Sequence, residues 1–211
     1  MKTTLQKDWP IVDGDLRRRD YESYTDYVAH QQAKLAHMGA AKLAAHEARY
    51  LEALLPRLAA DALPRGSSVI CLGARGGAEV RAFLSLGCVA VGVDLNPGEA
   101  NSYVLPGDFH YLAYGHGTVA TVFTNALDHC YELDRVLAEV HRVLMPDGTF
   151  LVEAVCGTEE GCQPGSYESL AWPTIQALVL HIKAQGFACR SGVPFICPWR
   201  GEHLRFARVG A

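Results

Sequence analysis

The sequence lacks the marks of several large protein classes. Its seven cysteines are an odd number and include no CxxC pair, so a zinc site is not expected. No stretch approaches the roughly 18 consecutive apolar residues of a membrane helix, and the first residues lack the apolar core of a signal peptide. We therefore expect free, mostly buried thiols, no membrane association and a cytoplasmic location.

Charge of one sign is not in excess either. The chain has 211 residues, with 19 basic and 23 acidic side chains and a formal net charge of −4. The short basic run at 17–19 is interpreted as a solvated surface stretch. This balance disfavours a chain that grips nucleic-acid phosphates. We expect a small-molecule partner and no nucleic acid, and a homo-oligomer stays open.

Hydrophobic patterns divide the chain near residue 65. Residues 1–65 are Ala-rich and predict a helical N-terminal extension with little strand character. Residues 66–211 alternate short apolar strands with amphipathic helices, which predicts an α/β fold, a doubly wound and mostly parallel sheet. The expected strands are 69–72, 88–93, 103–105, 119–124, 150–155, 187–191 and 204–209. The last two are joined without an obvious helix, so we expect an antiparallel hairpin at one edge.

A glycine-rich turn follows the first of these strands and an acid ends the second. The turn reads Gly73-Ala74-Arg75-Gly76-Gly77, and Asp94 comes 21 positions after Gly73. Ligands of open parallel sheets bind beyond the carboxyl ends of the strands. A carboxylate at this spacing accepts hydrogen bonds from the ribose hydroxyls of a nucleoside. The pair therefore favours a nucleoside-bearing ligand over a bare strand-to-helix turn.

The sequence lacks two motifs of nicotinamide-dependent oxidoreductases. A dinucleotide fingerprint would need glycine at positions 75 and 78, where the chain has Arg75 and Ala78, and no Tyr-x-x-x-Lys pair occurs. A nicotinamide-type oxidoreductase is thus the second hypothesis. A non-catalytic nucleoside-binding or interaction module on the same fold is the third.

Residues 67–209 resemble the class I S-adenosylmethionine-dependent methyltransferases, especially the small-molecule group. The matching segments keep the family's order along the chain. They are the glycine loop 69–77, the ribose acid segment 91–96, the adenine segment Gly107-Asp108-Phe109-His110, the fourth-strand segment 122–129, and the helix and turn 139–148. The implied fold is Rossmann-like, with seven strands of which the last is antiparallel.

The resemblance also implies a set of cofactor-binding residues for S-adenosylmethionine and its product S-adenosylhomocysteine. Gly73 and Gly77 would line the methionine part, Asp94 and the adjoining Leu95 the ribose, Asp108 and Phe109 the adenine, and Asn125 the methionine part or the acceptor. The family often has an acid where Cys71 stands and a glycine where Arg75 stands. These departures predict altered or weakened binding at the methionine end.

The acceptor side offers fewer signals. His129, beyond the end of a strand, is the candidate base, and the alternative is a helix cap or a packing residue. Tyr167 and Trp172 fall where substrate loops usually lie, and Glu153 faces either the pocket or a core partner. The segment 21–37 forms either a lid or an ordinary amphipathic helix. Asp128, Glu132 and Asp134 would be spread around a helix, so we expect no metal.

Overall fold

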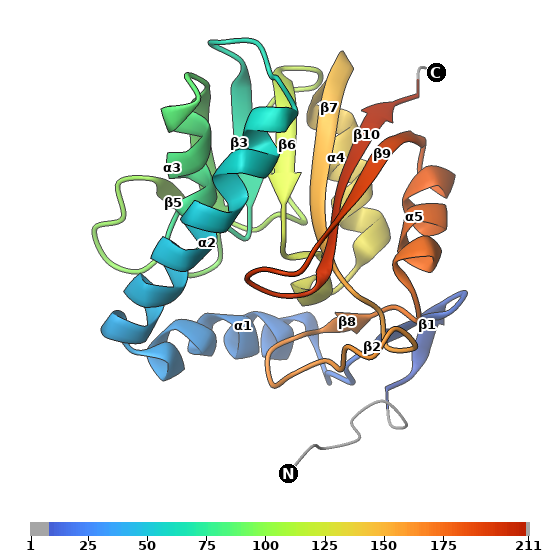
Figure 1. Ribbon diagram of the computed structural model, residues 1–211. Helices are drawn as coiled ribbons and strands as arrows, with labels where there is room; N and C mark the ends of the chain where they lie inside the picture. The colour runs from blue at the N-terminus through green and yellow to red at the C-terminus, as the bar shows by residue number, and fades with distance from the viewer. Residues whose placement is uncertain (1–8, 210–211) are drawn as a thin grey trace.

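The computed structural model describes residues 9–209 as a twisted sheet with helices on both faces (Figure 1). The strand order is β5-β4-β3-β6-β7-β10-β9. The first five strands in this order are parallel, and β10 is antiparallel to both of its neighbours. The strands are β3 (Ser68–Leu72), β4 (Val89–Asp94), β5 (Val104–Pro106), β6 (Val119–Thr124), β7 (Leu144–Val155), β9 (Phe187–Phe195) and β10 (Gly201–Arg208). The expected seven-stranded Rossmann-like sheet with its antiparallel hairpin is confirmed.

Side chains of β3 alternate between two hydrophobic clusters. Val69 and Cys71 pack with α2 (Ala40–Ala60) and α3 (Ala78–Ser85). Ile70 and Leu72 pack with α4 (Leu133–Val143) and α5 (Ile175–Ala184) on the other face. Because both faces are covered, residues 69–72 of the strand are all apolar and show no polar alternation.

The N-terminal part contains strands as well as helices. Before α1 (Tyr24–Met38), β1 (Ile11–Asp13) and β2 (Leu16–Arg18) form an antiparallel hairpin, and β2 also pairs with β8 (Leu170–Ala171). No strand was predicted at these positions. Leu16 at 3% exposure is the hairpin's one buried side chain among the described residues, so no alternating apolar pattern announced it. Residues 1–8 of the expected extension lie outside the described part.

The basic run at 17–19 is not a solvated surface stretch. Arg18 donates to the Tyr131 carbonyl oxygen at 3.2 Å and lies 4.1 Å from the centre of the Tyr131 ring. Arg19 donates to the carbonyl oxygens of Glu168 and Gly165 at 3.0 and 2.9 Å. The run is half-buried because its guanidinium groups tie the hairpin to segments more than a hundred residues away.

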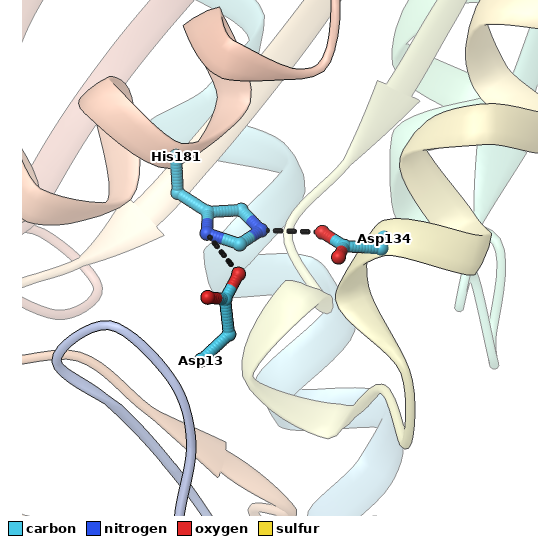
Figure 2. Close-up of side chains that lie close together, drawn as sticks. All are labelled: Asp13, Asp134 and His181. Atoms are coloured by element: carbon cyan, nitrogen blue, oxygen red, sulfur yellow. Dashed lines mark hydrogen bonds and ion pairs between the residues drawn. The ribbon is translucent and has the colours of Figure 1, made fainter.

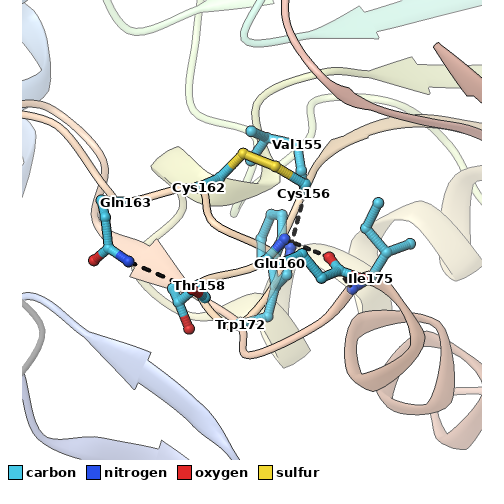
Figure 3. The surroundings of a disulfide bond; sticks show 9 residues. Val155, Cys156, Thr158, Glu160, Cys162, Gln163, Trp172 and Ile175 are labelled. Carbon is cyan, nitrogen blue, oxygen red and sulfur yellow. Dashed lines mark hydrogen bonds between the residues drawn. A yellow bond between two sulfur atoms is a disulfide. The ribbon is translucent and has the colours of Figure 1, made fainter. Parts of the chain in front are cut away.

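Two cysteines depart from the expectation of free thiols. Cys156 and Cys162 form a disulfide with their Cα atoms 5.6 Å apart, beside the buried Trp172 (Figure 3). The intervening loop turns back on itself because Glu160 accepts from the Gly157 backbone N–H at 2.6 Å. A separation of 6 along the chain does not reveal that turn. The remaining cysteines are free, namely Cys71, Cys88 and Cys130 in the interior and Cys189 and Cys197 nearer the surface.

Helix α1 crosses below the carboxyl ends of the central strands, and α2 rises from there along one face of the sheet (Figure 1). These two helices close the strand ends from one side. Within residues 9–209, we find no helix with the length and apolar character needed to cross a membrane.

Candidate functional site

A cavity of about 380 Å³ lies between the carboxyl ends of β3, β4 and β6 and the helices α1 and α2. Of the residues predicted for the site, six line it: Gly73, Asp94, Leu95, Phe109, Asn125 and His129. Gly77 and Asp108 are not part of the lining. Most of the site residues predicted from the sequence therefore lie around one cavity.

The glycine turn leaves no room for a side chain at its first position. A Cβ atom on Gly73, whose φ is +71°, would lie 2.5 Å from the Cβ of Ala126. Gly77 has φ +81° and faces Tyr103 instead, where a Cβ would lie 2.8 Å from that residue's Cβ. Arg75 adopts φ +35° without being glycine, so the turn keeps a left-handed backbone at the position where the family often has glycine.

Asp94 is held by backbone donors on both of its oxygens. Its Oδ2 accepts from the Arg75 N–H at 2.9 Å, and its Oδ1 accepts from the Asn96 N–H at 2.8 Å. A carboxylate has about four acceptor positions, so each oxygen retains one for a ligand. The strand end and the glycine turn therefore fix the orientation of this group before anything binds.

Asp108 lies behind the cavity and not in it. It accepts hydrogen bonds from the Tyr24 hydroxyl and from the His110 ring at 2.7 Å. Burial opposes the charged form, but these hydrogen bonds outweigh it and lower the pKa of the carboxyl group. His110 in turn accepts from the Tyr131 N–H at 3.1 Å. This group of contacts fastens α1 to the segment that carries Phe109.

His129 faces a lysine of α1. The Lys34 ammonium nitrogen lies 2.8 Å from His129 Nε2, and His129 Nδ1 donates to the Tyr167 carbonyl oxygen at 2.9 Å. The second contact sets the tautomer, so Nε2 is the acceptor. Burial, with help from Lys34 and Arg75, holds the pKa of His129 well below its usual range. His129 is therefore a neutral imidazole whose free lone pair points at Lys34.

Lys34 itself is set among charges of both signs. Burial and the nearby Arg75 lower the pKa of Lys34 to about 8, although Asp128 and Glu168 oppose that shift. Burial and Glu168 raise the pKa of Asp128 to about 7. Lys34 and Asp128, both on the cavity wall, therefore change their protonation state near neutral pH.

Two groups of side chains have the spacing of metal ligands. Asp128, His129 and Glu168 offer atoms within 4.8 Å of one another, but Lys34 already supplies a cation there at 2.8 Å from His129. The second group places His181 between Asp13 at 3.3 Å and Asp134 at 2.6 Å (Figure 2). The carboxylate side chains of this surface group are both 56% exposed. The group joins β1 to α4 and α5, and none of its three residues lines the cavity.

The three remaining candidates have partners in the protein interior. Glu153 accepts from Arg57 at 2.5 Å, from Tyr50 at 3.0 Å and lies 3.3 Å from His203. Trp172 is buried and donates to the Val155 carbonyl oxygen at 3.0 Å. The Tyr167 ring stacks on His30 with centroids 5.0 Å apart. Glu153 therefore has the core partner that was one of its two expected roles.

Comparison with known proteins agrees with this architecture. Residues 70–152 match the model of a family described as "Methyltransferase domain", and the matched part contains the glycine turn, Asp94, Phe109, Asn125 and His129. This part of the chain is therefore similar to a methyltransferase domain. The methyl donor of this family is S-adenosylmethionine.

Solved structures share the fold of the methyltransferase at low identity. The 1,6-didemethyltoxoflavin-N1-methyltransferase of Burkholderia thailandensis, with 1,6-didemethyltoxoflavin and S-adenosylhomocysteine bound, superposes with a TM-score of 0.73 at 16% identity, covering 96% of this chain and 99% of the other. A methyltransferase from Aquifex aeolicus gives 0.58 at 15% identity, covering 72% and 88%. A geranyl diphosphate methyltransferase gives 0.58 at 18%, covering 76% and 78%. No curated protein sequence matches the chain.

Several residues of the methyltransferase cavity escaped the sequence reasoning. Lys34 and Glu47 come from the helices that cover the strand ends, Glu79 from the first turn of α3, and Trp199 from the loop between β9 and β10. Glu47 accepts from the Ala78 N–H at 2.9 Å and caps α3 from outside. The one sequence signal for Glu79 was its position in the first turn of a helix. Acids at this position are also common where they interact only with the end of the helix.

Proposed function

We propose that the enzyme methylates a small or medium-sized organic acceptor at oxygen, nitrogen or carbon. The observation that carries this proposal is a single cavity of about 380 Å³ with the nucleoside-type residues at the strand ends and the Lys34–His129 pair in the same lining. A cavity of this size, closed over by helices, suits a small molecule better than a polymer.

For the cofactor half, we propose that Asp94 accepts from the ribose hydroxyls and that Leu95 and Phe109 border the nucleoside. Gly73 and Asn125 would border the methionine part, since a side chain at Gly73 would meet Ala126 and both residues line the cavity. Gly77 and Asp108 support the site from outside its lining, the latter through Tyr24 and His110. When bound, S-adenosylmethionine supplies a methyl group to an acceptor aligned with it.

For the acceptor half, we propose that Lys34 in its neutral form takes the proton of an N–H or O–H acceptor, and that His129 positions Lys34. His129 Nε2 accepts from the Lys34 nitrogen at 2.8 Å, which holds that nitrogen at the cavity wall. With a pKa of about 8, Lys34 is neutral often enough at working pH to act as a base. His129, the base expected from the sequence, thus acts through its neighbour.

For the organisation of the chain, we propose that residues 1–65 serve as a lid on the domain of residues 66–211. The described part of this lid supplies Tyr27, Gln31, Lys34 and Glu47 to the cavity. The Burkholderia thailandensis structure holds 1,6-didemethyltoxoflavin and S-adenosylhomocysteine together, and the geranyl diphosphate methyltransferase structure holds its diphosphate substrate. Both relatives support a small-molecule acceptor over nucleic acid or membrane.

The proposal is tested by calorimetric titration of the chain with S-adenosylmethionine and S-adenosylhomocysteine, followed by an acceptor screen that measures S-adenosylhomocysteine release. Titrations with NAD and NADP separate the oxidoreductase alternative. We expect micromolar binding of the first pair alone and turnover that Lys34→Met removes while S-adenosylhomocysteine still binds. Binding without turnover on any acceptor would favour a non-catalytic nucleoside-binding module.

A further inference from the structure

Glu79 is a buried carboxyl group on the cavity wall. It lies in the first turn of α3, directly after the glycine turn, with 3% of the residue exposed. It lines the cavity together with Gly73 and Asn125. A buried carboxylate ordinarily has a cationic or hydrogen-bonding partner, because leaving it unpaired is costly.

Within residues 9–209, no basic side chain forms an ion pair with Glu79. The other acids of the lining have hydrogen-bond donors or a lysine nearby. Glu47 accepts from the Ala78 N–H and lies 3.5 Å from Arg81, and Asp94 accepts from the Arg75 and Asn96 N–H groups. Asp128 and Glu168 both lie near Lys34, although Glu168 Oε2 has no hydrogen-bond partner of its own. Glu79 is therefore an acid with which a cationic group of a ligand can pair.

The strand below Glu79 offers no anion in its place. Cys71 of β3 is fully buried, and burial together with Glu79 raises the pKa of its thiol well above the usual value. A neutral thiol cannot balance an ammonium group. The methionine part of S-adenosylmethionine carries such a group, and the residues proposed for that part, Gly73 and Asn125, share the cavity with Glu79.

We propose that Glu79 is the anion that binds the ammonium group of the methionine part of S-adenosylmethionine. This inference rests on the proposed function, since it requires the cofactor to lie along Asp94, Gly73 and Asn125. It assigns to α3 a role that β3 cannot fill with Cys71. One side chain then supplies the negative charge that distinguishes the whole cofactor from a nucleoside without an amino-acid tail.

Proton release follows from the burial of Glu79. Burial, together with nearby Glu47 and Asp94, raises the pKa of Glu79 to about 8, against the opposing effects of its own backbone N–H and of Arg75. At pH 7 the free enzyme therefore holds a proton on Glu79, and a bound ammonium group favours its loss. The groups that face Glu79 are Glu47 and Tyr50 of α2, Arg75 of the glycine turn, Asp94 of β4 and Cys71 of β3.

The test compares two ligands that differ in the amino-acid tail. S-adenosylhomocysteine carries the ammonium group, whereas 5′-methylthioadenosine lacks it. We expect Glu79→Gln to weaken S-adenosylhomocysteine binding by about tenfold or more, because a charge-assisted contact is lost, and to leave methylthioadenosine binding unchanged. The matched control is Glu52→Gln on the exposed face of α2. Glutamine resembles the protonated carboxyl group in shape and charge, so the variant should fold.

Proton release gives a second readout that needs no variant. Titrations of the wild-type enzyme at pH 7 in two buffers of different ionisation enthalpy should show release of close to one proton with S-adenosylhomocysteine and none with methylthioadenosine. Unchanged S-adenosylhomocysteine affinity in Glu79→Gln, or binding without proton release, would overturn the role of Glu79. Failure of the wild-type enzyme to bind either ligand would instead contradict the proposed function.

Discussion

The two halves of the cavity are built in different ways. On the sheet side, the site residues lie at strand ends and are fixed by backbone groups close by, as with Asp94 and the N–H groups of Arg75 and Asn96. On the side of α1 and α2, single side chains reach across the molecule, as with Lys34 to His129 over 95 positions and Gln31 to Tyr167 over 136. The first half is preformed by the fold, whereas the second depends on a few long-range contacts.

The largest effect should come from the sheet side. Replacing Asp94 by Ala removes the acceptor for both ribose hydroxyls, and each charge-assisted hydrogen bond contributes roughly 1.5–3 kcal/mol. We expect S-adenosylhomocysteine affinity to fall by at least about 100-fold while the fold persists, as measured by calorimetry and thermal unfolding. The control is Asp147→Ala at an exposed position near the start of β7, and a wild-type dissociation constant for Asp94→Ala would refute the assignment.

A smaller effect, on the stability of the whole fold, should follow from removing the ion pair between α2 and the sheet. Arg57→Met removes the guanidinium group from the fully buried Glu153 carboxylate and leaves Tyr50 and His203 beside it, and the loss of a charge-assisted hydrogen bond costs about 1.5–3 kcal/mol. We expect the urea midpoint to fall accordingly, whereas Arg49→Met on the exposed face of α2 should leave it unchanged. Equal midpoints for the two variants would show that α2 is not held by this pair.

The smallest effect should be local to α1. Tyr24→Phe removes the hydroxyl that donates to Asp108, which fastens the helix to the Phe109 segment. We expect amide exchange in residues 24–38 to speed up about tenfold, while exchange in the strands stays as in the wild type. If α1 exchanges no faster in Tyr24→Phe, other contacts hold the helix and the division between the two halves is less sharp.

The same division explains what the sequence could predict. The strands, the glycine turn and Asp94 were predictable because apolar runs and residue spacing are local signals, and even the weak strand at 103–105 was found as β5. Lys34 and Trp199 had no local signal, since each reaches the cavity through tertiary packing. The β1–β2 hairpin was missed because Arg17 to Arg19 read as surface charges, although their bonding partners hold them half-buried.

The departures at positions 71 and 75 show how far a family pattern can be carried. Arg75 keeps the left-handed backbone of the turn at φ +35° and still offers its N–H to Asp94, so the geometry survives the loss of glycine. Cys71 leaves the strand without an anion, and the nearest candidate lies on α3. The pattern therefore predicts the path of the backbone better than it predicts which side chain carries a charge.

Amide exchange with and without S-adenosylhomocysteine tests the two-sided cavity most directly. At saturating ligand, we expect slower exchange both at the strand ends, in residues 73–77 and 94–96, and across residues 24–38 of α1. Protection on both sides would show that the N-terminal helices complete a site preformed by the sheet. Protection confined to the strand ends, with α1 unchanged, would contradict that account and leave the helices as a cover that the ligand does not touch.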